Sequence, residues 1–379
     1  MFDPPYETVL KPYGQALLAV ARRNTKIVCL GADLTRQTET DMFRDAIGER
    51  FINVGAAEAN MIGISAGLAR AGHVVFVNTF GVFCTRRCYD QIAMAIAYPR
   101  LNVKIVGFMP GLSSPGGPSH QAIDDVSLMR ALPGMTVVEP ADALEVTQAV
   151  DLIADHFGPV YMRLKRGETP IIFEANHRLD LARAQILRGG GGGDALIIAA
   201  GMMIPAALAA GRALEENGVI ATVVNAPVVK PLDTRTIVAE ASRSRIVVTA
   251  ENHTVIGGLG SAVAEALAEA GVPSPLRRIG VRDVFAESGS REYLFGRYGL
   301  APRTFLTLFG VGSRSTGRHR ARRRSRPRLE RTRRSDQQVE TIRKGETRCR
   351  CSLLSPLRSS RNTRSASKTI TNWNADPTA

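Results

Sequence analysis

Cysteine is scarce in this chain, which excludes the small disulfide-built domains of secreted proteins. The 379 residues contain five cysteines, Cys29, Cys84, Cys88, Cys349 and Cys351. A disulfide framework needs a dense, regularly spaced set, and these are few and scattered. We therefore expect free thiols and a reducing compartment, the cytoplasm.

Long apolar runs are also lacking. The N-terminus, MFDPP, has no charged region followed by an apolar core, so it predicts no signal peptide. The longest apolar runs are interrupted well short of the roughly 20 residues of a membrane span. Hydrophobic residues nevertheless make up 44% of the chain, enough for sizeable cores. We expect a soluble protein of two domains that does not bind membranes.

An excess of charge is absent from most of the chain. Residues 311–379 carry 19 Lys and Arg against 5 Asp and Glu, which accounts for the whole net charge of +14, whereas residues 1–310 carry 30 of each sign. The basic segment is rich in arginine and serine and poor in aromatics, a composition typical of disorder. It could bind nucleic acid with strong salt dependence. It could equally be an out-of-frame extension.

The first 180 residues alternate between buried-strand and helix patterns. This alternation predicts one α/β domain with a mainly parallel sheet over residues 10–180. The expected strands are 27–30, 73–77, 101–107, 136–138 and 160–164, and the expected helices include 13–22, 122–132 and 143–156.

Five consecutive glycines at 189–193 read as a flexible junction or a very loose hairpin. A second α/β unit follows and is predicted over residues 190–310. Its pattern begins with a strand at 195–201 and a helix at 204–216. The fold class is therefore α/β, with two successive domains and then the basic segment 311–379.

Residues 51–60, FINVGAAEAN, have the pattern of a strand that delivers one carboxylate, Glu58, to the start of a helix. Burying a carboxylate costs free energy unless a partner stabilises it, so Glu58 is a candidate for chemistry. The alternative is a solvated acid in a first helical turn, where the helix dipole favours it.

Three further patterns supply candidate site residues. Phe80 and Phe83 follow a strand and are either core residues or a platform for a flat ring. The glycine- and proline-rich loop at 110–121 presents His120, either a general acid or base or a packing residue. Arg163 and Arg166 end the last strand of the first domain and could bind a phosphate, or could form ordinary surface charge.

Six segments occur in the order found in one enzyme family. They are GAAEAN (55–60), TFGVF (79–83), GPSHQ (117–121), VVEPAD (137–142), KPLD (230–233) and ENH (251–253). Over about residues 10–305 the chain resembles the C-terminal subunit of a split transketolase. The resemblance implies a pyrimidine-binding domain for thiamine diphosphate, followed by the family's C-terminal domain.

The resemblance implies a role for each candidate residue. Glu58 would hydrogen-bond N1′ of the aminopyrimidine and favour the imino form that removes the C2 proton of the thiazolium. Phe80 and Phe83 would pack on the pyrimidine ring. His120 would contact the sugar and assist proton transfer. Arg166, supported by Arg163, would bind the substrate phosphate.

A Gly-Asp-Gly segment with a later Asn, through which the family binds the metal that holds the diphosphate, is missing here. The resemblance therefore implies that Mg²⁺ or a similar ion is held by a partner, the N-terminal transketolase subunit, in a heterotetramer or similar assembly. No metal ligand is assigned to this chain, and the chain alone should be inactive.

The implied reaction moves a two-carbon ketol unit from a ketose phosphate to an aldose acceptor. An acidic pair typical of the family is replaced by Pro115 and Gly116, and a histidine by Phe108 or Met109. The donor and acceptor thus stay open, and an unusual or branched ketose phosphate is the implied donor. The alternatives are a beta-type subunit of a thiamine diphosphate-dependent 2-oxo acid dehydrogenase and, in a different class, nucleic-acid binding through the basic segment.

Overall fold

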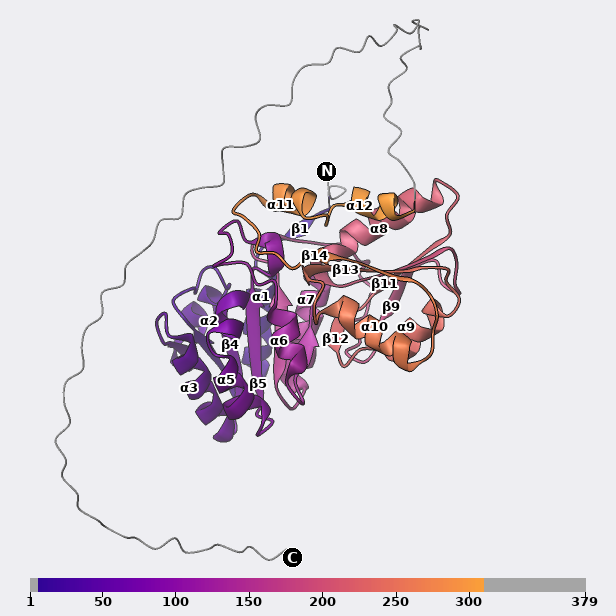
Figure 1. Cartoon of the computed structure of the whole chain (residues 1–379). Helices are drawn as coiled ribbons and strands as arrows, with labels where there is room; N and C mark the ends of the chain where they lie inside the picture. The colour runs from indigo at the N-terminus through magenta and orange to yellow at the C-terminus, as the bar shows by residue number, and fades with distance from the viewer. Residues whose placement is uncertain (1–5, 310–379) are drawn as a thin grey trace, which may run out of the picture. The chain divides into compact units, whose positions relative to one another are not determined.

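The structure, a computed structural model, describes residues 6–309 (Figure 1). It confirms the predicted α/β class, with two mainly parallel sheets that are covered by helices. Within the described residues, no helix is both long and apolar enough to cross a bilayer. The basic segment predicted at 311–379 lies outside these residues.

The first sheet has seven strands in the order β12-β6-β7-β5-β4-β2-β3. They are β2 (Ile27–Gly31), β3 (Phe51–Asn53), β4 (Val74–Phe80), β5 (Val103–Phe108), β6 (Thr136–Val138), β7 (Val160–Leu164) and β12 (Val228–Lys230). Six strands run parallel, and β12 pairs antiparallel with β6. Because β12 comes from beyond the glycine run, the second part of the chain completes the first sheet.

Strand β4 shows why this sheet is buried on both faces. All seven of its residues are buried, and alternate side chains enter opposite cores. Val75 and Val77 pack in the core that includes α3 and α6, whereas Phe76 and Phe80 pack in the core that includes α1 and α7. The helices of this domain are α1 (Pro12–Arg23), α2 (Asp41–Ala46), α3 (Glu58–Arg70), α4 (Gly81–Arg86), α5 (Tyr89–Gln91), α6 (Asp125–Ala131) and α7 (Ala143–Asp155).

The second sheet has five strands in the order β14-β13-β10-β11-β9, of which only β9 runs antiparallel to its neighbour. They are β9 (Gln185–Arg188), β10 (Ala195–Ala199), β11 (Ala221–Asn225), β13 (Val247–Thr254) and β14 (Leu276–Val281). The helices are α8 (Ile204–Glu215), α9 (Thr234–Ala241), α10 (Leu259–Glu269), α11 (Arg291–Arg297) and α12 (Pro302–Leu308). A small antiparallel ribbon joins β1 (Thr8–Val9) to β8 (Thr169–Pro170).

The glycine run at 189–193 corrects a prediction. It does not form a hairpin, because β9 pairs with β11 and not with β10, and the run is held by contacts although Gly189–Gly191 are exposed. The N–H groups of Gly191 and Gly192 donate to Glu240 Oε2 at 3.0 and 3.3 Å. A Cβ on Gly192 would lie 2.4 Å from the carbonyl oxygen of Arg243, and one on Gly193 would lie 2.8 Å from that of Ile220. Glycine is needed at both positions because the backbones approach so closely.

The predicted helix at 122–132 also begins later than expected, at Asp125 of α6. Ala122 instead forms an isolated parallel bridge with Pro110, and its carbonyl accepts the N–H of Gly111 at 2.8 Å. This contact joins the two ends of the loop that carries His120. The loop is therefore closed at its base and rests on the end of β5.

Candidate functional site

The candidate site residues follow the carboxyl ends of neighbouring parallel strands. Glu58 comes after β3, Phe80 ends β4, the His120 loop follows β5, and Arg166 follows β7. In parallel sheets these ends meet at one edge, where α/β proteins place their ligands. The topology thus explains why residues more than 100 positions apart can share a site.

Glu58 is the first residue of α3 and is only 5% exposed. The turn at residues 54–57 connects β3 to the helix and sets the carboxylate in the first helical turn, where the helix dipole stabilises negative charge. The sequence pattern predicted this placement.

Arg87, which the sequence analysis did not single out, pairs with Glu58. Its Nη1 donates to Glu58 Oε1 at 3.1 Å and to Oε2 at 3.2 Å. The Arg87 side chain is 53% exposed, so it covers the carboxylate from the solvent side. An arginine four residues after Phe83, at helical spacing, is the signal that could have found this partner.

The aromatic residues lie beside this pair. The Phe80 and Phe83 rings stack with centroids 5.8 Å apart and planes 28° apart, and Arg87 Cζ lies 4.2 Å from the centroid of Phe83. His120 approaches Phe83 edge-on at 5.3 Å. The fold therefore brings Glu58, Phe80, Phe83 and His120 into one continuous cluster.

The His120 loop is held by neighbouring side chains. Ser119 Oγ lies 2.9 Å from His120 Nδ1. Gly117 has φ +72°, and a Cβ there would lie 2.6 Å from Ser288 Oγ. Gln121, buried under the loop, donates to the carbonyl of Glu287 at 3.1 Å. Contacts with the second domain thus position the loop that presents the histidine.

Arg86 also holds this loop and contrasts with its neighbour Arg87. Its Nε lies 2.9 Å from both carboxylate oxygens of Asp124, and Nη2 reaches the carbonyl of Gln121 at 3.4 Å. Two adjacent arginines at the end of α4 thus face different parts of the site, one the histidine loop and the other Glu58.

The predicted phosphate role of Arg163 requires correction. Arg163 is 1% exposed, and its guanidinium pairs with Asp125 at 2.8 Å and Glu139 at 2.9 Å. It also donates to the carbonyl of Asn252 in β13 at 2.9 Å. Arg163 points into the protein and links the two sheets. Arg166, by contrast, is exposed after β7.

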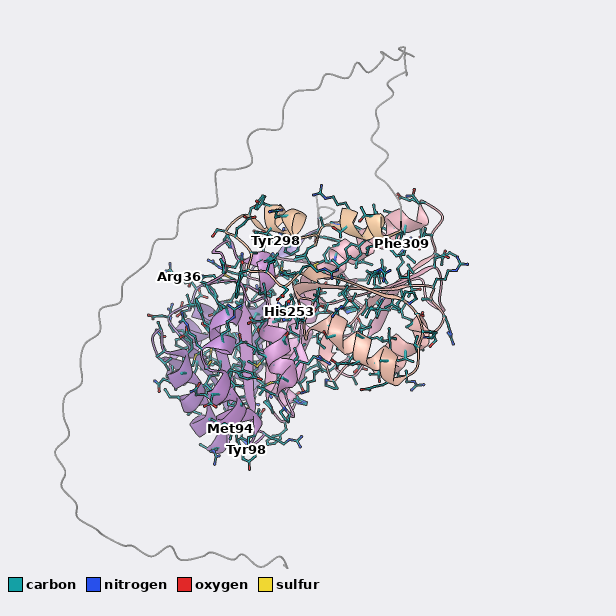
Figure 2. The ribbon with its side chains drawn as sticks, viewed as in Figure 1. Arg36, Met94, Tyr98, His253, Tyr298 and Phe309 are labelled. Carbon is teal, nitrogen blue, oxygen red and sulfur yellow. The ribbon has the colours of Figure 1, made fainter. Side chains whose placement is uncertain are left out.

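Burial and charge act in opposite directions on the two carboxylates beside Arg163. Burial, the largest single effect, would raise the pKa of Asp125, but the charges of Arg163 and His253 and the hydrogen bonds from Arg163 and Tyr161 together hold that pKa below its usual value. At Glu139 burial prevails over the arginine, and the pKa is raised. His253, labelled in Figure 2, is buried nearby with Nε2 3.8 Å from Asp125 Oδ1.

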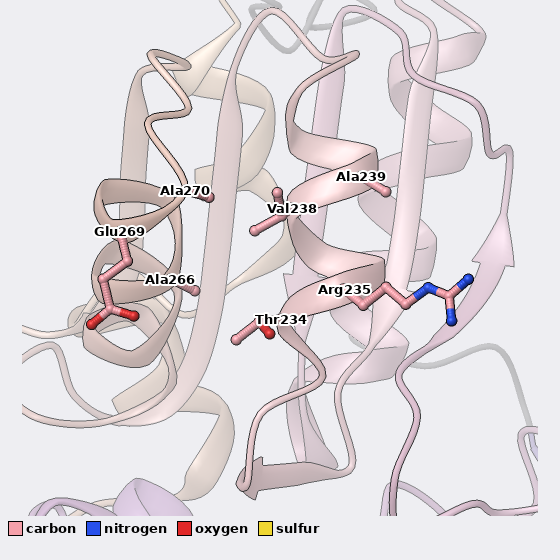
Figure 3. A pocket seen from close by; sticks show the side chains of 7 residues that line it. All are labelled: Thr234, Arg235, Val238, Ala239, Ala266, Glu269 and Ala270. Atoms are coloured by element: carbon pink, nitrogen blue, oxygen red, sulfur yellow. The ribbon is translucent and has the colours of Figure 1, made fainter.

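A groove between α9 and α10 lies in the second domain and contains none of the candidate site residues. Figure 3 shows the side chains that line it, Thr234, Arg235, Val238, Ala239, Ala266, Glu269 and Ala270. Its walls are mostly small and apolar. Over residues 6–309, His, Cys, Asp and Glu side chains form no group of three or more that could hold a metal ion.

Both domains match known family models. Residues 8–171 match the pyrimidine binding domain of transketolase, and residues 182–304 match the transketolase C-terminal domain.

Individual relatives agree with these matches. A transketolase family protein of Sinorhizobium fredii is 46% identical over 293 residues, which cover 76% of this chain and 84% of the relative. The 6-deoxy-6-sulfo-D-fructose transketolase subunit of a Clostridium species is 44% identical over 311 residues, covering 80% and 96%. A solved split gene transketolase, described as an inactive beta4 tetramer, superimposes with a TM-score of 0.73 at 43% identity, over 79% of this chain and 96% of that one. The chain therefore belongs to the transketolase family, as a transferase subunit that contains the pyrimidine-binding and C-terminal domains.

Proposed function

We propose that this chain supplies the Glu58 half of a thiamine diphosphate site, in an enzyme that moves a two-carbon ketol unit from a ketose phosphate to an aldose acceptor. The observation that carries the proposal is the cluster of a buried carboxylate, a stacked pair of phenylalanines and a histidine at one edge of the parallel sheet.

The residues present fit the aminopyrimidine of this cofactor. The Arg87 guanidinium is planar and donates N–H groups, and it contacts both the Glu58 carboxylate and the face of Phe83. A flat nitrogen-containing ring that donates to a carboxylate has the same requirements. Glu58, Phe80 and Phe83 would hold it, and the bound cofactor would supply the nucleophilic carbon of the reaction.

Each residue of the chain then has a distinct task. Glu58 hydrogen-bonds a ring nitrogen, which carries the N–H in the imino form that the carboxylate would favour, and, being buried, does so without competition from water. His120 has Nδ1 engaged by Ser119, which leaves Nε2 to exchange a proton with a substrate hydroxyl. Arg166, exposed after β7, binds the anionic end of the sugar.

A partner subunit is proposed to hold the diphosphate and Mg²⁺, because the chain lacks the Gly-Asp-Gly segment. The exposed faces of α3 and of the helical segment after α5 are suited to such a partner. Among the described residues, a Cβ on Gly63 or Gly67 of α3 would meet no atom within 4 Å. Met94 and Tyr98, labelled in Figure 2, are 59% and 81% exposed on the adjoining helical segment. The assembly we propose is a heterotetramer or similar.

The sugar is proposed to be an unusual ketose phosphate. Pro115 and Gly116 are exposed at the His120 loop, where typical transketolases carry an acidic pair. The Clostridium relative is named for a sulfonated ketose, which supports a variable donor site in such subunits.

The relatives reported above are transketolases, which favours ketol transfer over the 2-oxo acid dehydrogenase alternative. Nucleic-acid binding through residues 311–379 and a cytoplasmic location stay predictions. Truncation after residue 310 tests the former, because ketol transfer that survives truncation shows that the basic segment is dispensable for the chemistry.

Reconstitution tests the proposed function. The chain would be co-expressed with a Gly-Asp-Gly-containing partner and assayed across a panel of ketose phosphates with and without thiamine diphosphate and Mg²⁺. We expect transfer only when both subunits and both cofactors are present. A stable complex that binds the cofactor but transfers a ketol unit from no donor would contradict the proposal.

A further inference from the structure

Arg87 makes two contacts at once. Its Nη1 donates to both oxygens of the buried Glu58 carboxylate, at 3.1 and 3.2 Å, while its Cζ lies 4.2 Å from the centroid of the Phe83 ring. These are the carboxylate and the aromatic face that a flat, N–H-donating cofactor ring would need. The guanidinium and such a ring cannot both occupy them.

The position of Arg87 in the chain favours movement of its side chain. It follows the last residue of α4, and the backbone of Cys88 then leaves helical geometry, with φ −131° and ψ 26°. A short helix and a π-helical segment, Ile92–Ala97, come next. Breaks and π-helical turns of this kind are frequent at functional sites.

The neighbouring residues keep the backbone in place while that side chain moves. Arg86 is tied to Asp124, and Cys88 is buried in the core. The Arg87 side chain is 53% exposed. It can therefore turn into solvent without disturbing the packing of the residues on either side.

We propose that Arg87 is a placeholder for the cofactor ring: it neutralises Glu58 and covers Phe83 in the cofactor-free chain, and it turns out to solvent when the aminopyrimidine binds. This inference rests on the proposed thiamine diphosphate site. Its physical purpose is to keep a buried carboxylate paired before the cofactor arrives, because an unpaired buried charge destabilises the fold. The structure thus contains a competitor for its own cofactor.

The affinity of the complex for thiamine diphosphate tests whether Arg87 is such a placeholder. The reconstituted complex would be titrated with thiamine diphosphate at saturating Mg²⁺ by calorimetry, with wild-type chain and with Arg87→Ala. Loss of a half-exposed ion pair and a cation–π contact should tighten binding by about threefold to tenfold. Arg87→Lys, which keeps charge but loses the planar group, should fall between the two.

Arg23→Ala is the matched control, because Arg23 is also an exposed arginine that pairs with a carboxylate, Asp151, at the end of α1. It should leave the cofactor affinity unchanged. A second readout is the thermal midpoint of the complex, which Arg87→Ala should lower without cofactor but not at saturating cofactor.

Weaker or unchanged cofactor binding by Arg87→Ala would overturn the placeholder, since the first result makes Arg87 a ligand and the second makes it irrelevant to the ring. A wild-type complex that binds no thiamine diphosphate would instead contradict the proposed function itself. The two failures are therefore distinguishable.

Discussion

Two arginine–carboxylate clusters of this molecule share the same chemistry and differ in burial. Arg87 pairs with Glu58 at the rim of the candidate site and is half exposed. Arg163 pairs with Asp125 and Glu139 and has no exposed side-chain surface. An exposed guanidinium can exchange its partner for water or a ligand at little cost, whereas a buried one cannot. Burial therefore separates an exchangeable contact from a permanent one.

The buried cluster serves the architecture. Arg163 donates to the backbone carbonyls of Ala122 and Asn252, 130 residues apart, and so ties the His120 loop to β13 of the second sheet. Asn252 reinforces this link, because its side chain accepts from Leu112 N–H at 2.8 Å and donates to the Pro110 carbonyl at 3.0 Å. The second domain thus shapes the site without supplying its candidate catalytic groups.

Removing the buried cation should have the largest effect. Arg163→Met leaves Asp125 and Glu139 unpaired in the core, so we expect the free energy of unfolding to fall by about 3–5 kcal/mol. Urea unfolding of the chain measures this change. Adding Asp125→Asn to the same variant should restore part of the loss, because it removes one unpaired charge. A loss below about 1 kcal/mol would show that the cluster does not bind the domains together.

Removing the carboxylate of the exposed cluster should affect chemistry more than stability. Glu58→Gln keeps the shape but loses the charge, and we expect turnover of the reconstituted enzyme to fall by about 100- to 1,000-fold, or roughly 3–4 kcal/mol in the barrier. The substrate KM should change little, because Glu58 is proposed to contact the cofactor and not the sugar. Steady-state kinetics and a urea titration separate the two effects. Near-normal turnover would remove Glu58 from the proposed mechanism.

At a fourth buried carboxylate, Glu39, burial is the largest effect and prevails over the neighbouring cation Lys11 and two backbone hydrogen bonds. Burial raises the pKa of Glu39 to about 7, although the Gly14 N–H donates to it at 3.0 Å. Because the folded state then holds this proton more tightly than the unfolded chain, the stabilisation is complete below about pH 4.5 and is lost as pH rises to about 7. The loss should be about 3 kcal/mol.

Glu39→Gln is the control for this pH dependence. The difference in unfolding free energy between wild type and variant, measured by urea titration, should fall by that amount between pH 4 and pH 8. A difference that does not change with pH would show that burial does not raise the pKa of Glu39.

The sequence was sufficient to predict the α/β class and the position of Glu58 at the start of a helix, because these depend on short-range signals. Alternating strand and helix patterns set the parallel sheet, and the carboxyl ends of parallel strands converge without further information. The glycine run shows the limit of this reasoning, since composition suggested flexibility and only the contacts with Glu240 and Arg243 show that the run is held.

Tertiary structure decided the rest. The pairing of Glu58 with Arg87, the inward turn of Arg163 and the addition of β12 to the first sheet join residues that lie from 29 to about 90 positions apart. Local propensity does not specify such pairs, because they depend on how the helices and the two sheets pack against one another. The same residue type thus became an exchangeable partner at the rim and a fixed link in the core, and the difference in solvent exposure is the physical reason.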